Sequence, residues 1–418
     1  MDCDGAPPPP EQISSLTTIH SLGEDLLLEI FLLLPSLATL VRAALACRAW
    51  RRAVASSPSF RSRFRALHPA PFLGVFTNPE VPALPAFTPA HHRDRDVLAA
   101  VRGGDFFLTS VLQDDDELPV SWIIECCRDG YLLLMNWNTG ILAIVNPLAG
   151  HCPDYIEYPD ESDPSARWLG VHLLSSEEDP ISFRLLYVSC DDSRVRAAVF
   201  SSDTSDWQFF PWFEVAPRTP TNDGHIYWLG RRNQVGRIMY WLFTNLEYIL
   251  ALDTDTMEFS VYQLPACLQG HMFYNVFFGG TKDDVPCIAY DTGYSIRVLM
   301  FIADEEDGIG AWVLGGCVRY DEHPDLLEHG TRIMAIEDGF VYLDSSYMLI
   351  WLSLETWEVQ KLFPKTFCIF HYNSCIQGHR CLLYPYVMSW PPSLLGNYGV
   401  FAALLDDDDD PSREQGML

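Results

Sequence analysis

The chain has 418 residues, of which 48% are hydrophobic and 13% aromatic, which is enough to bury a sizeable core and excludes a largely disordered protein. Acidic residues number 56 against 27 basic ones, so the formal net charge is −29. Because nucleic acids and anionic lipids are bound mainly through basic groups, this balance argues against both and favours a basic or neutral partner.

The N-terminal part of the chain divides into a leader and a helical region. Residues 1–17 contain a run of four prolines and are expected to be disordered. Residues 18–68 are predicted to be a helical domain, because apolar residues recur there at helical spacing. The segment 24–34 opens with two acidic residues and stops at Pro35, and a second helical pattern covers 37–54.

A further helix is predicted at the end of this domain. Ser57 followed by Pro58 is typical of an N-cap and a first helical position, and the basic segment after it continues through Leu67. The charge also changes here: residues 1–70 carry seven arginines and six acids, so the rest of the chain holds all of the excess negative charge.

Beyond residue 68 the pattern changes from helix to strand. Residues 69–95 hold several prolines and are predicted to be a linker. Residues 96–405 consist of short Val, Ile, Tyr, Trp and Phe runs separated by turn residues. Three copies of Asp-Gly followed by a strand, a turn and a second strand begin at Asp129, Asp223 and Asp338.

With degenerate copies between them, these units repeat every ~40–60 residues, the range of propeller blades. One blade cannot bury both of its faces, so neighbouring blades must stack on it. We expect a β-propeller of about six to eight blades, with an irregular β-sandwich as the alternative. Residues 406–418 form an acidic tail that is expected to be disordered.

The helical region resembles the F-box, the short three-helix motif by which substrate receptors dock onto the Skp-type adaptor of cullin ubiquitin ligases. Order and spacing match over about forty residues. Gly23 stands where the family usually has proline, and Ala46 stands where valine precedes the cysteine. The residues that carry the resemblance are Leu22, Glu24, Asp25, Leu28, Glu29, Ile30, Leu32, Leu33, Leu34, Pro35, Leu40, Arg42, Cys47, Arg48, Trp50, Arg51, Ser57, Pro58 and Phe60.

The strand repeats resemble the kelch-like, F-box-associated propellers of plant F-box families, most clearly between Asp129 and Leu148. Together the two resemblances imply a multidomain α plus all-β protein that is a non-catalytic substrate receptor of a Skp-cullin-F-box ubiquitin ligase. Its partners would be the Skp-type adaptor, through it the cullin, and an unidentified target. The resemblance places adaptor binding on Leu22, Leu28, Ile30, Leu33, Leu34, Pro35, Leu40, Cys47 and Trp50.

Two other functions remain open at this point. One is a stand-alone propeller that binds carbohydrate or protein, with an incidental helical leader. The other is an adaptor-bound scaffold that acts without ubiquitin transfer, for which the Gly23 departure leaves room.

Several residue groups suggest chemistry but fit a structural role better. Cys368, His371, Cys375 and His379 could ligate zinc, but their spacing matches no common zinc finger, and strand alternation would separate them. The adjacent pair at 126 and 127 would point to opposite faces of a strand. Since catalytic motifs are also missing, we expect no catalytic residue, metal or cofactor.

The sequence also suggests a compartment. Its 12 cysteines lack a Cys-x-x-Cys pair, and the first 20 residues lack the basic start and apolar core of a secretory signal. The most apolar stretch, Leu26–Leu34, is far shorter than the ~20 residues of a membrane span. We therefore expect a protein of the cytoplasm, the nucleus or both.

Overall fold

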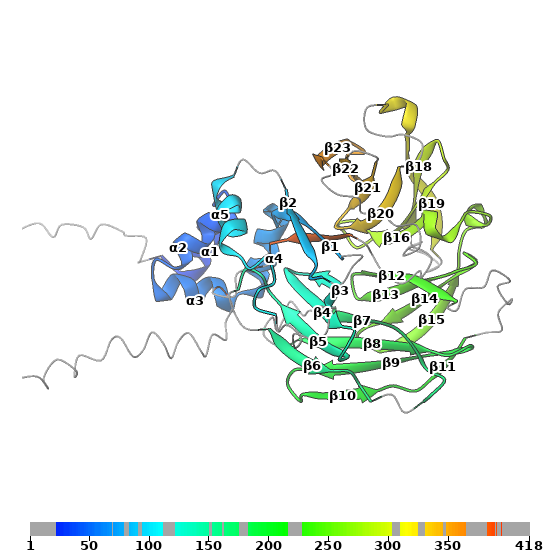
Figure 1. The fold of residues 1–418 in the computed structure, drawn as a ribbon. Coiled ribbons are helices and arrows are strands. Elements are labelled where there is room, and N and C mark those ends of the chain that lie inside the picture. The colour runs from blue at the N-terminus through cyan, green and yellow to red at the C-terminus, as the bar shows by residue number, and fades with distance from the viewer. Residues whose placement is uncertain are drawn as a thin grey trace, which may run out of the picture. The chain divides into compact units, whose positions relative to one another are not determined.

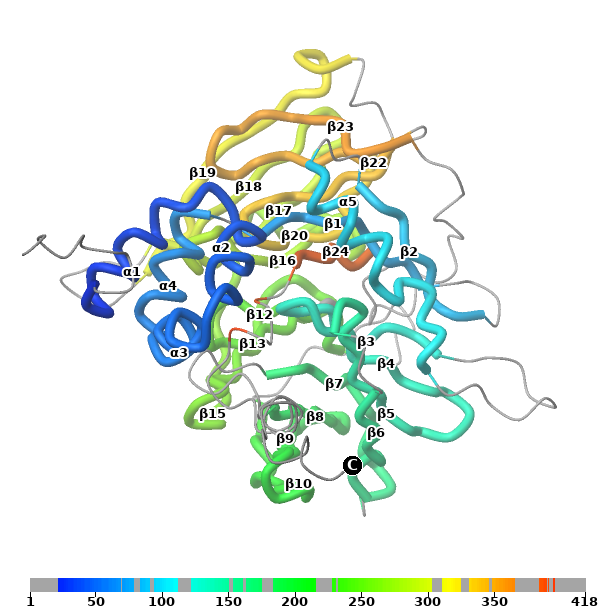
Figure 2. Tube along the Cα trace, turned by 90° about the vertical axis from the view of Figure 1, so that its left-hand side faces the viewer, coloured from blue at the N-terminus to red at the C-terminus, as the bar shows by residue number. Residues whose placement is uncertain are grey.

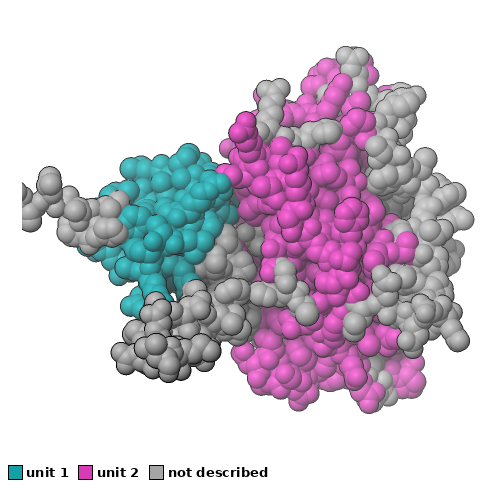
Figure 3. Space-filling model, turned by 60° about the vertical axis from the view of Figure 1, so that its left-hand side comes forward, with its two compact units in different colours: residues 1–70, 391–418 teal, residues 71–390 magenta. Residues whose placement is uncertain are grey.

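In the computed structural model the chain forms two compact units, residues 1–70 with 391–418, and residues 71–390 (Figure 3). The described residues are 22–68, 70–78, 83–90, 94–111, 122–149, 153–160, 163–174, 183–215, 228–302, 310–324, 331–345, 348–364, 383–388, 390 and 394. Outside them lie the expected leader over 1–17, the expected tail over 406–418, the repeat copy at Asp223, and Cys368, His371, Cys375 and His379.

The described part of the first unit holds four helices, where the F-box resemblance implied three. They are α1 (Glu24–Leu32), α2 (Leu37–Ala44), α3 (Arg48–Ser56) and α4 (Pro58–Leu67), drawn in blue in Figure 2. The division between α3 and α4 falls at Ser57, whose Oγ accepts a hydrogen bond from the N–H of Phe60 at 3.2 Å. Because proline has no N–H to continue a helix, the chain restarts there, as the Ser-Pro signal predicted.

The four helices share an apolar interior. Phe31, Leu40, Val54 and Phe64 are each no more than 2% exposed. The ring of Trp50 meets that of Phe31 edge-on, with 5.5 Å between their centroids. Helix α1 contacts both α3 and α4, and α2 contacts α3. A helical unit this small buries little area, so a single packed layer carries most of its stability.

The second unit is a propeller of six antiparallel sheets around one centre (Figure 1). This confirms the expected propeller, at the lower end of the expected blade number. One sheet combines the first two strands of the propeller with the last one: β1 (Phe72–Thr77), β2 (Ala86–Pro89) and β24 (Leu383–Val387).

The other five sheets consist of β3 (Trp122–Arg128), β4 (Tyr131–Asn136), β5 (Ile141–Val145) and β6 (Asp154–Glu157); β7 (Arg167–Leu174), β8 (Arg184–Cys190), β9 (Arg194–Ser201), β10 (Asp206–Phe209) and β11 (Phe213–Glu214); β12 (Leu229–Val235), β13 (Ile238–Phe243), β14 (Tyr248–Asp253) and β15 (Glu258–Gln263); β16 (Val276–Gly280), β17 (Pro286–Asp291), β18 (Ser295–Ile302) and β19 (Ala311–Arg319); and β20 (Arg332–Glu337), β21 (Phe340–Asp344), β22 (Met348–Ser353) and β23 (Val359–Pro364). Four of these five sheets are up-and-down meanders of four neighbouring strands, and in the β7 sheet β11 returns to pair with β9 beside β10.

The linker expected over 69–95 differs from the structure, which places β1 and β2 there. Strand β1 lies between β2 and β24, so the two ends of the propeller segment close the ring in one shared sheet (Figures 1 and 2). Prolines in this region mark strand ends: Pro71 precedes β1, and Pro89 ends the edge strand β2, positions at which a missing N–H does little harm.

Apolar clusters fill the spaces between neighbouring blades. One joins the β1 sheet to the β3 sheet, and others join the β3 and β7, the β7 and β12, the β12 and β16, and the β16 and β20 sheets. The cluster around Val75 and Tyr342 joins the β20 sheet back to the β1 sheet. Because every blade has an apolar neighbour on both faces, middle strands such as β5, β14 and β21 are apolar almost throughout and show little alternation.

The remaining elements are short. Helix α5 (Arg95–Gly103) follows β2, and 3-10 turns cover Ala266–Leu268, Phe273–Asn275 and Tyr320–Glu322. Helix α5 was not predicted; Asp94 caps it by accepting a hydrogen bond from the N–H of Asp96 at 2.8 Å. None of the helices in the described part of the chain has the length and apolar character needed to cross a membrane.

Two of the predicted Asp-Gly repeats are described, and both are tight hairpin turns. Asp129 and Gly130 have φ values of 50° and 76°, and Asp338 and Gly339 have 48° and 78°. Two successive positive φ values are characteristic of the type I′ turn, whose twist matches that of the flanking strands. The Asp-Gly pairs therefore mark the connection from the first to the second strand of a blade.

Candidate functional site

Helix α1 presents apolar side chains on its outer as well as its inner face. Leu26, Ile30 and Leu33 are 60%, 39% and 82% exposed. Their spacing of four and then three residues places them on one side of the helix, while Leu27 and Phe31 are buried. We call Leu26, Ile30 and Leu33 the α1 stripe.

The residues expected to bind the adaptor occupy three environments. Ile30, Leu33 and Pro35 are exposed, and Leu40 is fully buried. The remaining predicted residues are half-buried: Leu22, Leu28, Leu34, Cys47 and Trp50. Trp50 packs against Phe31, so truncation of Trp50 would disturb the helical interior.

Three exposed leucines of the helical unit lie outside the predicted adaptor-binding set: Leu26 on α1, Leu45 at the end of α2 and Leu67 at the end of α4. Leu26 lies within a run of three leucines. The register that turns Leu27 inward and Leu26 outward is set by packing against the other helices. A helical wheel centred on Phe31 would have been the available signal.

An ion pair joins α1 to α4 on the surface of the helical unit. Arg63 Nη1 and Nη2 donate to Glu29 Oε1 and Oε2 at 2.6 and 3.0 Å. The hydrogen bond from Arg63 lowers the pKa of the Glu29 carboxyl. Both side chains are more than half exposed, so we expect this pair to orient α1 more than to stabilise it.

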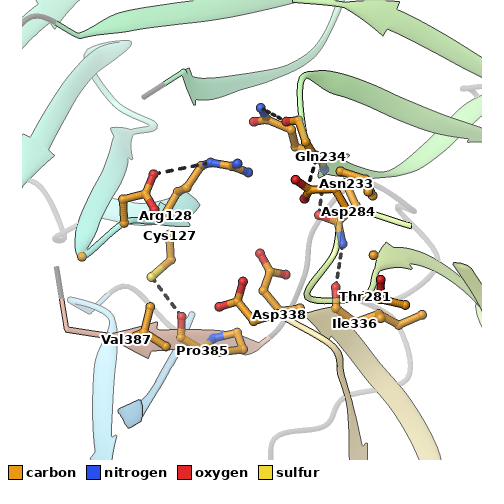
Figure 4. A pocket seen from close by; sticks show the side chains of 16 residues that line it. Cys127, Arg128, Asn233, Gln234, Thr281, Asp284, Ile336, Asp338, Pro385 and Val387 are labelled. Atoms are coloured by element: carbon orange, nitrogen blue, oxygen red, sulfur yellow. Dashed lines mark hydrogen bonds and ion pairs between the residues drawn. The ribbon is translucent and has the colours of Figure 1, made fainter. Parts of the chain in front are cut away.

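A second candidate site lies at the centre of the propeller. Two hollows of about 100 and 110 Å³ are lined by the first strands of the sheets together with β24 (Figure 4). Both hollows are lined by Cys127, Arg128, Asn233, Gln234, Ile336, Glu337 and Pro385. We therefore treat them as one space, the central hollow.

Polar side chains connect the blades around the central hollow. Arg232 of β12 donates through Nη1 to Leu169 O at 2.7 Å and through Nη2 to Glu125 O at 3.2 Å, and it also pairs with Glu125 Oε2. Burial works against the charge of Arg232, but Glu125 stabilises it and the pKa of the guanidinium is raised. Arg232 thereby ties three blades together.

Two further contacts continue this arrangement. Asn233 Nδ2 donates to Phe278 O at 3.2 Å and to Ile336 O at 2.8 Å. On the other side, Cys127 Sγ donates to Pro385 O at 3.2 Å, as Figure 4 shows. Every sheet thus sends at least one group into the ring of polar contacts.

A neutral histidine lies in the same space. His172 of β7 lines the hollow, is 5% exposed, and its Nε2 has no hydrogen-bond partner among the described residues. Burial, followed by the charges of Arg232 and Arg128, holds its pKa well below the usual value. The ring is therefore neutral at physiological pH, with a polar atom that lacks a described partner.

Several carboxyl groups border the hollow at the turns between the first and second strands of the blades. Burial, and then the charge of Asp338, raises the pKa of Glu337 to about 8. Burial, and then Asp129, raises the pKa of Asp338. Arg128 lowers both pKa values, and its Nε lies 3.7 Å from Asp129 Oδ2. Among the described residues, neither Glu337 nor Asp338 forms an ion pair with a base.

The thiols and acids of the described residues do not form a metal centre. No group of three or more His, Cys, Asp and Glu side chains is close enough there to hold a metal ion. Burial raises the pKa of both Cys126 and Cys127. Cys126 packs into the cluster shared with the β7 sheet and Cys127 into the one shared with the β1 sheet, so the two point to opposite faces, as predicted.

Family comparisons agree with this architecture. Residues 19–65 match the F-box-like family, and residues 123–394 match the family described as F-box protein AT5G49610-like, beta-propeller. No curated protein matches the chain.

Several solved structures resemble part of the chain. TolB from Acinetobacter baumannii is 17% identical with a TM-score of 0.31, over 57% of this chain and 53% of TolB. Hsv2p from Kluyveromyces lactis is 15% identical with a TM-score of 0.31, over 57% of this chain and 63% of its own. The Cps50 (Swd1) β-propeller domain from Myceliophteria thermophila is 10% identical with a TM-score of 0.33, over 56% and 70%. TM-scores of this size say nothing about function.

The family assignment therefore rests on the two sequence matches. The structure has the same order of parts, helices first and propeller blades after them. The propeller family covers more than half of the chain, directly after the F-box-like segment. The protein belongs to the F-box protein AT5G49610-like β-propeller family.

Proposed function

We propose that this protein is the substrate-recognition subunit of a Skp-cullin-F-box ubiquitin ligase. The helical unit docks the Skp-type adaptor, and the adaptor connects the chain to the cullin. The propeller holds the target protein. The observation that carries the proposal is the α1 stripe, an exposed apolar surface within a segment that matches the F-box-like family.

The physical argument rests on burial of the stripe. Single exposed leucines are common on protein surfaces, but here Leu26 and Ile30 of α1 and Leu33 at its C-cap are all exposed within eight residues of the chain. Fully burying one such side chain is worth roughly 1.5–3 kcal/mol. A partner groove that covers Leu26, Ile30 and Leu33 would gain most of its binding energy from this face.

The proposed role requires no catalytic residue in this chain. A receptor that holds its target beside the charged conjugating enzyme raises the effective concentration of a target lysine. Complexes of this kind work in the cytoplasm and the nucleus, and we propose the same compartments here. With an acidic propeller segment, the target surface is expected to be basic or neutral.

Co-purification with a Skp-type adaptor tests the proposal. The full chain and the adaptor are co-expressed beside an Ile30→Asp, Leu33→Asp variant, whose changes lie on the exposed face of α1. Leu67→Asp is the matched control, since Leu67 is 60% exposed at the end of α4. We expect wild type and control to retain the adaptor, and the α1 variant to lose at least about 90% of it.

Two outcomes would redirect the assignment. If folded wild-type chain fails to retain any Skp-type adaptor, the protein is a stand-alone propeller. If it binds the adaptor but supports no ubiquitin transfer to any co-purified protein in a reconstituted ligase, it is a scaffold. Unchanged melting temperatures of the variants show that a loss of binding is not a loss of folding.

A further inference from the structure

The central hollow is polar, bordered by several blades, and not used by the adaptor-docking surface. Its lining residues come from β3, β7, β12, β16, β20 and β24. Its charges do not balance. Glu125 and Arg232 form a pair, and Arg128 lies beside Asp129 and also lowers the pKa of Glu337 and Asp338. Two basic side chains of the described lining, Arg128 and Arg232, therefore face five acidic ones, Glu125, Asp129, Asp284, Glu337 and Asp338.

The acids border the hollow from two blades: Glu337 and Asp338 from the β20 sheet, and Asp284 from the turn between β16 and β17. Figure 4 shows the Asp338 side chain directed into the space, with Arg128 and Asp284 on its other sides. Asp284 Oδ1 already accepts a hydrogen bond from the N–H of Gly236 at 3.1 Å, so its carboxylate is fixed in place. Glu337 is half-buried and borders both parts of the hollow.

An independent observation also indicates a ligand. His172 is 5% exposed and has an Nε2 without a hydrogen-bond partner among the described residues. It lines the part of the hollow that Glu337 also borders and that Asp284 and Asp338 do not line. Buried polar atoms nearly always have a partner, and an orphaned one needs an explanation. A polar group that enters from the acidic border and reaches the level of β7 would supply that partner.

We propose that the central hollow binds one extended cationic group, the guanidinium or ammonium end of a protein side chain, between Glu337, Asp338 and Asp284. A hollow of about 100 Å³ suits one long side chain better than a folded segment. No group of three or more His, Cys, Asp and Glu side chains among the described residues is placed to hold a metal ion, whereas a guanidinium has several donors that reach separate carboxylates. Binding itself does not depend on the ligase role; its use in target selection rests on the proposed function.

Peptide titration of the purified full chain tests this inference. The probe is an N-acetylated, C-amidated Gly-Arg-Gly peptide, and the dissociation constant is measured from its NMR signals. The matched neutral probe replaces arginine with citrulline, which has nearly the same shape without the charge. Spermidine is the third probe, a free cation that no protein supplies.

The variant is Glu337→Gln with Asp338→Asn, which removes two carboxyl groups and keeps the side-chain shapes. Because burial, and then the charge of Asp338, raises the pKa of Glu337 to about 8, the titration is run at about pH 9, where the Glu337 carboxyl is ionised and the arginine side chain keeps its charge. Glu258→Gln is the control, because Glu258 is exposed on β15, the strand of its blade farthest from β12. We expect the arginine peptide to bind wild type and control alike and the double variant at least about tenfold more weakly. The citrulline peptide should bind at least about tenfold more weakly to all three.

Three results would overturn the proposal. These are equal binding of arginine and citrulline peptides, equal binding of the arginine peptide to wild type and double variant, and binding of spermidine without any binding of the arginine peptide. If the double variant fails to fold, Glu337→Gln alone replaces it. The titration uses no adaptor, so its failure is distinguishable from failure of the ligase proposal.

Discussion

Arg232 shows how one side chain can hold several blades. Its guanidinium reaches carbonyl groups of β3 and β7 and the Glu125 carboxylate. The path is open because residue 170 is glycine: a Cβ there would lie 1.7 Å from Arg232 Nη1. The glycine is therefore required by a contact between blades. Its own backbone adds to this requirement, because its φ of 152° at a register shift of β7 is one that other residues rarely adopt.

Gly170→Ala should consequently be costly. The methyl group displaces the guanidinium from its partners and leaves Glu125 buried with a weakened pair, a loss of about 3 kcal/mol or more in the free energy of unfolding. Gly103→Ala is the control, since nothing lies within 4 Å of its Cβ position. Urea denaturation of both variants measures the difference, and similar stabilities would show that Arg232 is not a structural anchor.

Glu337, in the same central hollow, makes the free energy of unfolding depend on pH. Its pKa is about 8 in the folded chain against 4.5 for the ordinary carboxyl, through burial and Asp338, with Arg128 and Asn233 acting in the opposite direction. Between these two values the folded state binds the proton and the unfolded state does not. The free energy of unfolding therefore falls as pH rises from about 4.5 to about 8.

The Glu337→Gln substitution removes this pH-dependent contribution to the free energy of unfolding. Wild type and variant should have similar melting temperatures near pH 4.5, and the variant should become progressively more stable than wild type as pH approaches 8 and beyond. Thermal unfolding over a pH series gives the difference curve. A difference that is constant with pH would mean that the Glu337 carboxyl titrates normally in the folded chain.

At the scale of elements, the helices and turns that could be predicted are those whose sequence signal lies within a few neighbouring residues. The Ser57-Pro58 helix start and the Asp-Gly hairpins were predictable, because caps and type I′ turns need particular residues at adjacent positions. Strand β1 was missed because its pairing partner β24 lies some 300 residues away in the chain, and the flanking prolines suggested a linker.

The candidate sites show the same limit. The sequence placed an apolar helix at 24–34 but could not tell which of its leucines face outward, so Leu26 was left out of the adaptor-binding set. The resemblance added Leu40 of the next helix, which the structure buries. The central hollow could not be predicted, because His172, Asn233 and Glu337 meet through ring closure and share no sequence spacing. Polar residues near the end of the first strand of each blade are a sequence signal for the hollow, and that signal is weak.

At the scale of the whole molecule, stability depends on closure of the ring. Strand β24 supplies Leu383 to one apolar cluster and Tyr384 and Tyr386 to another. The hydroxyl of Tyr384 also donates to Ile124 O at 2.7 Å. Loss of β24 would open the clusters on both sides of the closing sheet.

Truncation tests this dependence. A chain that ends at residue 364 loses β24, and a chain that ends at residue 394 keeps it. The shorter chain should lose cooperative thermal unfolding and become aggregation-prone, because it exposes a strand edge and two opened cores. The longer one should unfold like the full chain. A cooperative transition in the shorter chain would show that the remaining five sheets suffice.

Ring closure also sets an order of events during synthesis. The ribosome releases the helical unit early, whereas β24 emerges after almost the whole propeller has been made, and domains tend to fold as they emerge. The segment that matches the F-box is thus ready to meet a partner while the central hollow still lacks Pro385 on one side. A nascent chain would acquire its docking helices before it could select any ligand at the propeller centre.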